Sequence, residues 1–430
     1  MKIIIHRGIN QIGGCITEIT TEKTKIIIDL GHNLPKSDKP ANDPKANEEA
    51  IKELTKDVSA IFYTHYHGDH VDLFKFVPKN VKQYMGETAK HVMICKYKRL
   101  AKLPEKTNVT HEDIETLHRF HIFSAKQKNH VGDITVTPYF ISHSACDAFM
   151  FVVEVNGKRI LHTGDFRGHG YLSKELFDTI GKYILEKPVD VLITEGTMLA
   201  RLDERVLHEN DLKVKAEMLM EKKYVFIMCS STDMERLASF HAAHLNTKHA
   251  SPFVCDDYQK DILEIFSKSS GKKSELFDFF KKKDIYDFEE TNQKLVNWMI
   301  DKGFCMLVRA TEKFEKYWAF LKPHLNMHET ILIHSMWKEY INPESPHAKK
   351  DYVEFITKFP VVDQLHTSGH AIADCLAKVC NLVNPNAAII PIHSEHSEKF
   401  KELPISAELR EKVVTTSCTV QGIEIEIMQK

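Results

Sequence analysis

The sequence has 430 residues, more than the roughly 250–300 that one hydrophobic core usually serves, so two or three domains are expected. Hydrophobic residues make up 43% and charged residues 27%, which excludes a disordered or fibrous chain. With 58 Lys and Arg against 60 Asp and Glu, the formal net charge is −2. This balance excludes a strongly basic packaging protein, although a local groove on a neutral protein can still bind nucleic acid.

No apolar run approaches the roughly 18–20 residues that span a bilayer, and the sequence begins with a predicted strand instead of a signal peptide. The nine cysteines are scattered and form no C-x-x-C pair. They predict reduced, buried thiols in a cytoplasmic protein. The lack of a long apolar run predicts that the protein has no membrane partner. Histidine is frequent, at 25 residues, which favours a metal enzyme only where the histidines cluster at ligand spacing.

In chain order, the N-terminal half is predicted to consist of short strands joined by turns, with a hairpin turn at Asn156-Gly157. The expected strands are 2–6, 25–30, 60–64, 131–142, 150–155, 159–162 and 189–194. From about residue 200 to 350, helical Lys-rich segments alternate with strands. The expected helices include 211–223 and 260–283, and the expected strands are 224–229, 304–310 and 330–334. A clear strand over 387–392 follows, so the pattern predicts α/β units.

A histidine and aspartate cluster follows the strand 60–64 directly. It reads H-x-H-x-D-H from His65 to His70. Imidazole nitrogen suits zinc and a carboxylate adds charge, so His65, His67, Asp69 and His70 are candidate ligands. The alternative is a solvated loop, and the density of ligand types at this spacing argues against it.

Further candidate ligands come directly after other predicted strands. His143 follows 131–142, Asp165 follows 159–162, and His393 follows 387–392. Each alone is more often structural than a ligand, but together with the first cluster they complete a dinuclear set. The predicted set has one metal on His65, His67 and His143, a second on Asp69, His70 and His393, and Asp165 bridging both. Such a site, without cysteine and with room for water, is typical of a catalytic centre.

These motifs resemble the metallo-β-lactamase superfamily, and within it the β-CASP nucleases. The superfamily motifs are the Gly13-Gly14 turn, Asp29 in Ile28-Asp29-Leu30-Gly31, the 65–70 cluster, His143 and Asp165. The β-CASP motifs are Glu195 in Thr194-Glu195-Gly196-Thr197, His370 in Ser368-Gly369-His370-Ala371, and His393 in Pro391-Ile392-His393-Ser394. The pair His366 and His370 resembles the RNase J group, without the C-terminal domain usual in that group.

The resemblance covers nearly the whole chain and implies a four-layer αββα metallo-β-lactamase fold with an inserted α/β β-CASP domain. The expected boundaries are 1–200 and 351–430 for the metallo-β-lactamase domain and 201–350 for the insert. The implied activity is that of a zinc-dependent nuclease with two zinc ions, or manganese in their place. It would hydrolyse single-stranded RNA to 5′-phosphate and 3′-hydroxyl products, as a 5′ exonuclease, an endonuclease or both. A homodimer is one expected assembly.

The resemblance also implies roles for individual residues. Asp69 and Asp165 would serve the metals, which activate water and clamp the reacting oxygens. His370, oriented by Glu195, would protonate the leaving 3′ oxygen. His366 would bind the scissile phosphate, and Asp29 would steady the histidines from outside the ligand set.

A substrate-binding segment is expected after the strand 224–229. The expected substrate-binding residues are Ser230, Ser231, Thr232, Arg236, His366, Ser368 and His370. Thr232-x-x-Glu235 is also a capping-box pattern, and N–H groups at a helix start can bind phosphate. A capped helix without a ligand is the equally consistent alternative.

Other functions stay open at this stage, because the fold alone does not choose among them. One is a single-stranded DNA nuclease, and another is a hydrolase of small esters, thioesters or lactams. A histidine at position 393 is usual in RNA-acting members, which favours RNA. A non-catalytic nucleic-acid-binding subunit is disfavoured because every expected ligand is present.

Overall fold

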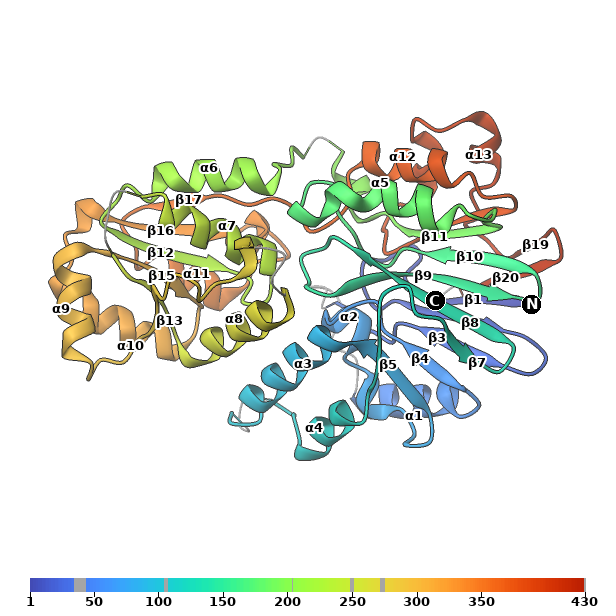
Figure 1. Cartoon of the computed structure of the whole chain (residues 1–430), viewed down its shortest axis with the longest axis horizontal. Helices are drawn as coiled ribbons and strands as arrows, with labels where there is room; N and C mark the ends of the chain where they lie inside the picture. Colours follow the sequence, from blue (N-terminus) through green and yellow to red (C-terminus); the bar gives the residue numbers. More distant parts are fainter. Residues whose placement is uncertain (35–43, 104–106, 203, 248–250, 271–274, 429–430) are drawn as a thin grey trace. The chain divides into compact units, whose positions relative to one another are not determined.

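The chain folds into two compact units, which the computed structural model describes over residues 1–34, 44–103, 107–202, 204–247, 251–270 and 275–428 (Figure 1). Unit 1 contains the chain up to Glu204 and again from Gly369, and unit 2 contains Arg205–Ser368. The return to unit 1 thus comes later than the expected residue 351. The reason is that β17 (Val362–Gln364) still pairs with β16 (Thr330–Ser335) in the sheet of unit 2.

Unit 1 contains two sheets. The first runs in the order β19 (Cys418–Val420), β20 (Ile423–Ile427), β1 (Lys2–Arg7), β2 (Ile16–Thr20), β3 (Lys25–Ile28), β4 (Ala60–Phe62), β5 (Lys82–Gly86) and β6 (His121–Phe123). The second runs in the order β18 (Ala388–Ile392), β11 (Val191–Glu195), β10 (Lys158–His162), β9 (Ala148–Val155), β8 (Ile134–Ile141) and β7 (Asn129–Val131).

One apolar core joins the facing sides of these two sheets. Ile3 and Phe62 from the first sheet and Phe151 and Ile390 from the second belong to the same buried cluster. The other face of the second sheet is apolar too and packs against helices. The helices of unit 1 are α1 (Pro44–Thr55), α2 (Gly68–Val71), α3 (Glu87–Leu100), α4 (His111–His118), α5 (Leu176–Thr179), α12 (Ala373–Val383) and α13 (Ala407–Glu411). Helices flank the sheet pair on both sides (Figure 1), which confirms the expected four-layer αββα fold.

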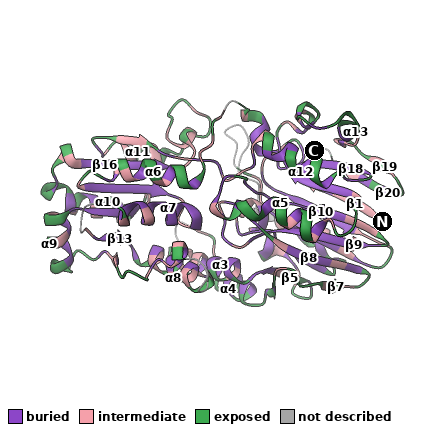
Figure 2. Cartoon of the chain, turned by 45° about the horizontal axis from the view of Figure 1, so that its top comes forward, coloured by how far each residue is buried: buried purple, intermediate pink, exposed green. Residues whose placement is uncertain are grey.

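Unit 2 is built on a third sheet whose paired strands are all parallel. Its order is β14 (Ile285–Asp287), β13 (Phe253–Cys255), β15 (Phe304–Val308), β12 (Tyr224–Cys229), β16 and β17. The helices of this unit are α6 (Glu209–Leu219), α7 (Met234–Leu245), α8 (Asp257–Ser270), α9 (Gln293–Lys302), α10 (Glu312–Leu321) and α11 (Lys350–Ile356). The central strands are buried along their length (Figure 2), as expected for a parallel sheet covered on both faces.

Most predicted strands are present, with ends that differ by one or two residues. The predicted hairpin joins β9 and β10 through Asn156 and Gly157, which both have positive φ. The strand expected over 131–142 is present as β8 but begins only at Ile134, because Gly132 (φ 56°) reverses the chain between β7 and β8. The helix expected over 260–283 is too long. It ends at Ser270 as α8, after Ser269 has turned its hydroxyl back onto the Phe266 carbonyl.

None of the helices that the structure describes combines the length and the apolar character needed to cross a membrane.

Candidate metal centre

The predicted ligands gather because the strands that carry them end at one edge. β10, β11 and β18 are parallel neighbours, and β8 runs in the same direction as β10 because both are antiparallel to β9. His143, Asp165 and His393 each come just after one of these strands, and Glu195 is the last residue of β11. β4 of the first sheet delivers the 65–70 cluster to the same group.

The backbone turns sharply where side chains must face inward. Asp29 (φ 60°) and His393 (φ 50°) both adopt the left-handed conformation that non-glycine residues rarely adopt. Gly31 lies so close to the 65–70 cluster that a Cβ there would be 1.6 Å from the Asp69 carbonyl oxygen. The cluster is therefore held by backbone strain at Asp29 and His393 and by a close contact at position 31 that only glycine allows.

The first group of ligand atoms consists of three imidazoles. His65, His67 and His143 each offer a ring nitrogen, and these nitrogens lie within 4.8 Å of one another. His143 Nε2 lies 3.1 Å from His67 Nδ1. His143 Nδ1 donates to the Gly369 carbonyl at 2.7 Å, so its Nε2 carries a lone pair. Two nitrogens at this spacing suit a cation between them.

The second group mixes imidazole and carboxylate. Asp165 Oδ2 lies 3.1 Å from His70 Nε2 and 3.4 Å from His393 Nε2. Asp69 Oδ2 lies 3.1 Å from His393 Nε2 and 4.0 Å from His70 Nε2. Asp165 also offers an oxygen within 4.8 Å of a ring nitrogen of His65, so it lies between the two groups. This is the position that a bridging ligand requires.

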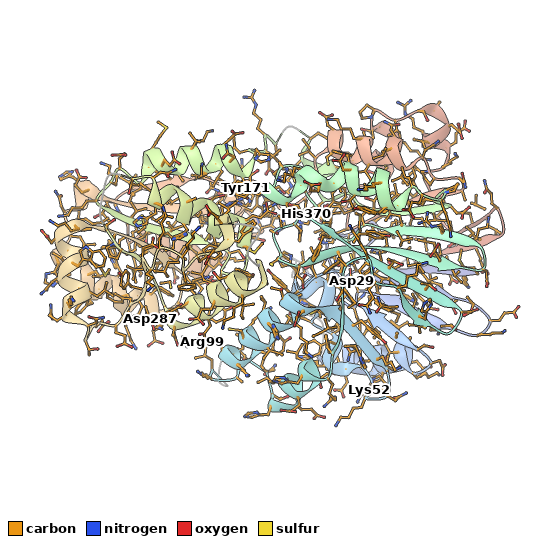
Figure 3. All side chains as sticks on the ribbon, in the orientation of Figure 1. Asp29, Lys52, Arg99, Tyr171, Asp287 and His370 are labelled. Carbon is orange, nitrogen blue, oxygen red and sulfur yellow. The ribbon has the colours of Figure 1, made fainter. Side chains whose placement is uncertain are left out.

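Outer partners fix the orientation of these imidazoles. Asp29 Oδ2 accepts from His70 Nδ1 at 2.8 Å, and it also accepts from the Thr64 hydroxyl at 2.8 Å. Because its proton goes to Asp29, the Thr64 hydroxyl can accept from His65 Nδ1 at 3.0 Å. The Nε2 atoms of both histidines therefore face the cluster. Asp29, a side chain of unit 1 labelled in Figure 3, thus lies where an outer, steadying role was expected.

Charge divides the cluster into two unlike halves. Burial lowers the pKa of His67 to about 4, and burial together with neighbouring histidines lowers the pKa values of His65 and His143 well below 6.5. The lowered pKa values favour the neutral form of these three rings, which is the form that ligates metals. Burial alone would raise the pKa of Asp165, but His393 and His70 hold it well below its usual range.

Burial and neighbouring charges also have opposite effects on the pKa values of Asp69 and His70. Burial would raise the pKa of Asp69, yet His70 and His393 keep it below its usual range. Burial would lower the pKa of His70, yet Asp165 and Asp29 raise it well above 6.5. Ionised carboxylates in a buried place are costly unless positive charge lies beside them. This half of the cluster is therefore built to hold cationic charge.

Two buried atoms test whether the residues fit a metal. His65 Nε2 and Asp165 Oδ1 are inaccessible to solvent and have no hydrogen-bond partner among the described residues. Buried polar atoms are normally paired, so an unpaired ring nitrogen and carboxylate oxygen in one cluster indicate a missing electropositive partner. Divalent cations with mixed nitrogen and oxygen ligands meet that need, so the residues fit metal binding.

A proton-handling pair lies beside the ligands. His370 (labelled in Figure 3) places Nδ1 3.1 Å from Glu195 Oε2 and 3.7 Å from Asp165 Oδ2. Burial would lower the pKa of His370, but Glu195 raises it above 6.5. Glu195 is itself fully buried and accepts backbone N–H groups of Phe166 and Ala371 at 2.9 and 3.2 Å. The carboxylate therefore orients His370 and the segment after Asp165 together.

The structure adds two residues that the motifs did not indicate. Thr197 donates its hydroxyl proton to the His393 carbonyl, and its Oγ1 lies 2.7 Å from His393 Nδ1 and 3.2 Å from His370 Nδ1. Cys15 lies within 4.8 Å of His70 and His393 ligand atoms, although the sequence predicted a site without cysteine. Thr197 is the last residue of the segment quoted around Glu195, and Cys15 directly follows the Gly13-Gly14 turn; this adjacency is the signal that the sequence offers.

The other predicted substrate residues belong to unit 2. Ser230, Ser231 and Thr232 follow β12, and the Ser231 hydroxyl lies 3.4 Å from Arg309 Nη1. The helix start predicted at Thr232 is wrong by one residue, because Asp233 caps α7 by accepting the Arg236 N–H. The aspartate is favoured because an anionic cap also interacts well with the helix dipole.

Arg236 is enclosed in a buried network of this unit. Its guanidinium contacts Glu209 Oε1 at 2.9 Å and Ser335 Oγ at 2.6 Å, and it donates to the Thr367 carbonyl at 3.0 Å. Arg236 and Glu209 side chains are 1% and 0% exposed. His366 Nδ1 lies 3.3 Å from the guanidinium, and burial together with Arg236 lowers the pKa of His366 well below 6.5. His366 and the buried Ser368 lie in unit 2, whereas His370 lies in unit 1.

We expect Arg236→Ala to destabilise unit 2 by about 3–5 kcal/mol, because Glu209 would keep a buried charge without its main partner. All three tryptophans lie within unit 2, so urea unfolding followed by tryptophan fluorescence measures this effect. Lys316→Ala removes an exposed ion pair with Glu312 on α10 and should change the midpoint little. Equal midpoints for the two variants would contradict the structural role of Arg236.

Comparisons with known proteins identify a matching family and several similar proteins. Residues 24–249 match the family model "Beta-lactamase superfamily domain". Ribonuclease J of Mycoplasma genitalium is 24% identical over 92% of this chain and 68% of its own length. An RNase J-like protein of Methanocaldococcus jannaschii is 26% identical over 46% of this chain and 43% of its own length.

A solved structure shares the fold across both units. The crystal structure of a protein of unknown function from Enterococcus faecalis V583 matches with a TM-score of 0.70 and 19% identity, over 94% of this chain and 96% of that one. The likeness concerns the fold alone. Together with the family match and the motifs, it leads to one assignment: the chain belongs to the metallo-β-lactamase superfamily, in its RNase J-like β-CASP branch of metal-dependent hydrolases.

Proposed function

We propose that this chain is a metal-dependent ribonuclease that hydrolyses phosphodiester bonds of single-stranded RNA to 5′-phosphate and 3′-hydroxyl products. The observation that carries the proposal is the convergence of imidazole and carboxylate ligands beside the oriented pair Glu195 and His370. The RNA substrate is supported by similarity to ribonucleases J of two Mycoplasma species, at 24% and 23% identity. This chain spans 68% of their length and less than half of the Methanocaldococcus relative.

Two zinc ions, or manganese in their place, are the proposed cofactors. His65, His67 and His143 would hold one ion, and His70, His393 and Asp69 the other, with Asp165 shared. When bound, such ions supply Lewis acidity and an activated water. Asp69 and Asp165 keep negative charge at the centre, and Asp29 and Thr64 keep the imidazoles turned inward.

His370 is the proposed proton donor of the reaction. Glu195 accepts from Nδ1, so Nε2 is the nitrogen that delivers a proton to the leaving 3′ oxygen. The carboxylate also favours the protonated ring, which raises the share of the acid form near neutral pH. Thr197 fixes the orientation of the His370 and His393 rings relative to each other, because its hydroxyl contacts both rings. None of the nine cysteines, all of which lie in the described part of the chain, forms a disulfide, which suits the reducing cytoplasm proposed as its compartment.

A cleavage assay on end-labelled single strands tests the proposal. RNA and DNA of one sequence, each with a 5′-monophosphate or a 5′-hydroxyl, are incubated with Zn²⁺ or Mn²⁺. We expect metal-dependent loss of RNA, and none with the double variant Asp69→Asn, His70→Ala. Mononucleotides that require the 5′-monophosphate would indicate a 5′ exonuclease, and internal fragments an endonuclease. Faster loss of DNA would replace the RNA assignment, and no cleavage of either strand would overturn the nuclease proposal.

A further inference from the structure

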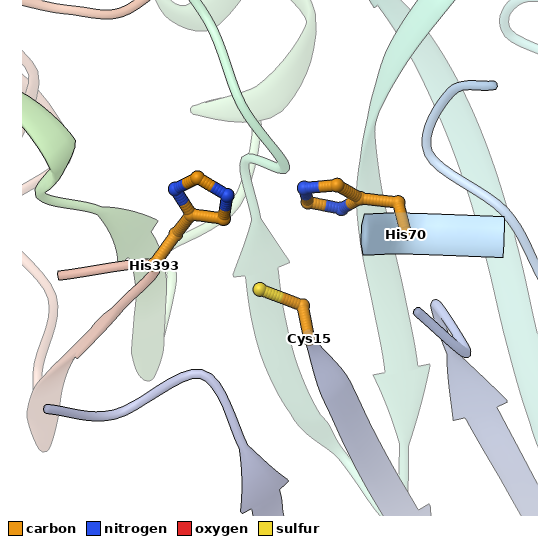
Figure 4. A group of neighbouring side chains, drawn as sticks. All are labelled: Cys15, His70 and His393. Atoms are coloured by element: carbon orange, nitrogen blue, oxygen red, sulfur yellow. The ribbon is translucent and has the colours of Figure 1, made fainter. Parts of the chain in front are cut away.

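A thiol faces the half of the metal centre that contains the carboxylates. Cys15 Sγ and one ring nitrogen each of His70 and His393 lie within 4.8 Å of one another. Figure 4 shows the sulfur pointing toward the gap between the two imidazole rings. The same gap is bordered by Asp165 Oδ2, at 3.1 Å from His70 Nε2 and 3.4 Å from His393 Nε2. We call this space the His70–His393 position.

The backbone fixes Cys15 at this place from both sides. Its N–H donates to the Asp69 carbonyl at 3.1 Å, and its carbonyl accepts from the Gly31 N–H at 3.1 Å. Gly13 and Gly14 directly before it have φ of 74° and 65°, a conformation that side chains rarely adopt. The segment that presents the thiol is thus hydrogen-bonded directly to the segment that presents the carboxylate of Asp69.

The Cys15 sulfur is buried and has room to face the neighbouring imidazoles. The Cys15 side chain is 1% exposed, and a Cβ at position 8 would lie 3.0 Å from Sγ, so Gly8 leaves the sulfur its room. An independent observation concerns Asp165, whose Oδ1 is buried in the same cluster without a hydrogen-bond partner. The other oxygen of this carboxylate, Oδ2, borders the two imidazoles that the thiol faces, so the unpaired Oδ1 indicates a cation within the same cluster.

We propose that Cys15 is a metal ligand at the His70–His393 position, and that this position therefore selects a thiophilic ion such as zinc over manganese. On binding, the S–H bond breaks, a sulfur–metal bond forms and the proton passes to solvent. Thiolate favours zinc, whereas sites built from carboxylates and water suit manganese. The three-imidazole position has no sulfur, so the two positions differ in metal preference. The inference rests on the proposed function only in that the cluster binds metal.

Cobalt(II) loading of the whole chain tests the inference without an activity readout. We expect the cobalt-loaded protein to show a thiolate-to-cobalt charge-transfer band in the near ultraviolet, and Cys15→Ser and Cys15→Ala to lose it. Cys380→Ala is the matched control, because Cys380 is equally buried in unit 1 but lies in the apolar core around α12. The zinc-over-manganese preference of the Cys15 variants should fall by at least about tenfold.

A second measurement needs no variant. X-ray absorption of the zinc-loaded chain should contain a sulfur shell at about 2.3 Å. Visible cobalt bands without the charge-transfer band, together with a nitrogen and oxygen shell alone, would overturn the role of Cys15 and leave the metal-dependent function intact. Failure of the chain to retain any cobalt or zinc would overturn both, so the two failures are distinguishable.

Discussion

Asp165→Asn should lower RNA cleavage on the order of 10³-fold or more, because several kcal/mol of metal-derived charge stabilisation depend on this carboxylate. Asparagine keeps the size of the side chain but removes the charge. Asp165 is the predicted bridging ligand, and the structure brings it near both halves of the cluster, with ligand atoms of His65 and His70 in reach. Its loss should therefore disturb both metal positions. Elemental analysis of the purified variant and kcat on labelled RNA are the two measurements.

The control for this variant changes another aspartate in the same way. Asp284 pairs with His241 at 3.1 Å in unit 2, so Asp284→Asn also removes a carboxylate from a buried histidine. It should retain metal content and cleavage, because this pair lies outside the ligand cluster. An Asp165→Asn variant that keeps both metals and full cleavage would show that Asp165 is not a shared ligand.

The proposed ligand set can be predicted from the sequence because each ligand segment follows a strand. A run of β-branched or aromatic residues predicts a strand, and parallel strands that neighbour each other end at one edge. Asp165 and His393 come just after β10 and β18, and Glu195 is the last residue of β11; these three strands are consecutive in the second sheet. The strand pattern of the sequence and the geometry of a parallel sheet thus both predict that these residues lie together at one edge of the second sheet. The fold class follows by the same reasoning.

Contacts between distant segments are harder to predict. Cys15 follows a glycine pair in an N-terminal turn, and nothing in its neighbours reveals that His393 lies nearby. Thr197 reads as an ordinary turn residue until His370 and His393 are placed around it. Both contacts depend on how loops close at the edge of the sheets, and this closure depends on tertiary packing instead of on periodicity.

Burial also distinguishes a structural arginine from a substrate-binding one, a difference that the sequence does not show. Arg236 was predicted to bind substrate because it follows the Ser230–Thr232 segment, yet its guanidinium is enclosed by Glu209, Ser335 and Thr367. A sequence shows that an arginine follows a strand but not which acid it pairs with. The partner, Glu209, comes from α6, and only the packing of α6 against α7 places it.

His370→Ala should lower kcat by about 10²–10⁴-fold, the usual range for the loss of a general acid, while both metals are retained. The reason is that Glu195 and Thr197 engage His370 Nδ1, and the proposed mechanism assigns Nε2 to the leaving oxygen and no ion to this ring. Elemental analysis and single-turnover cleavage measure the two quantities separately. His130→Ala, which changes an exposed histidine on β7, should leave both unchanged.

A substrate with sulfur in place of the leaving 3′ oxygen distinguishes proton donation from a structural role. A thiolate leaves without a proton, so this substrate should restore most of the rate lost in His370→Ala. Glu195→Gln should show the same rescue in part, because Glu195 acts through His370 but also holds the Phe166 and Ala371 N–H groups. A His370 variant that loses metal, or that cleaves the oxygen and sulfur substrates with equal loss, would contradict the general-acid role. Metal loss would instead assign His370 to the ligands, since its ring lies within reach of Asp165 and His143.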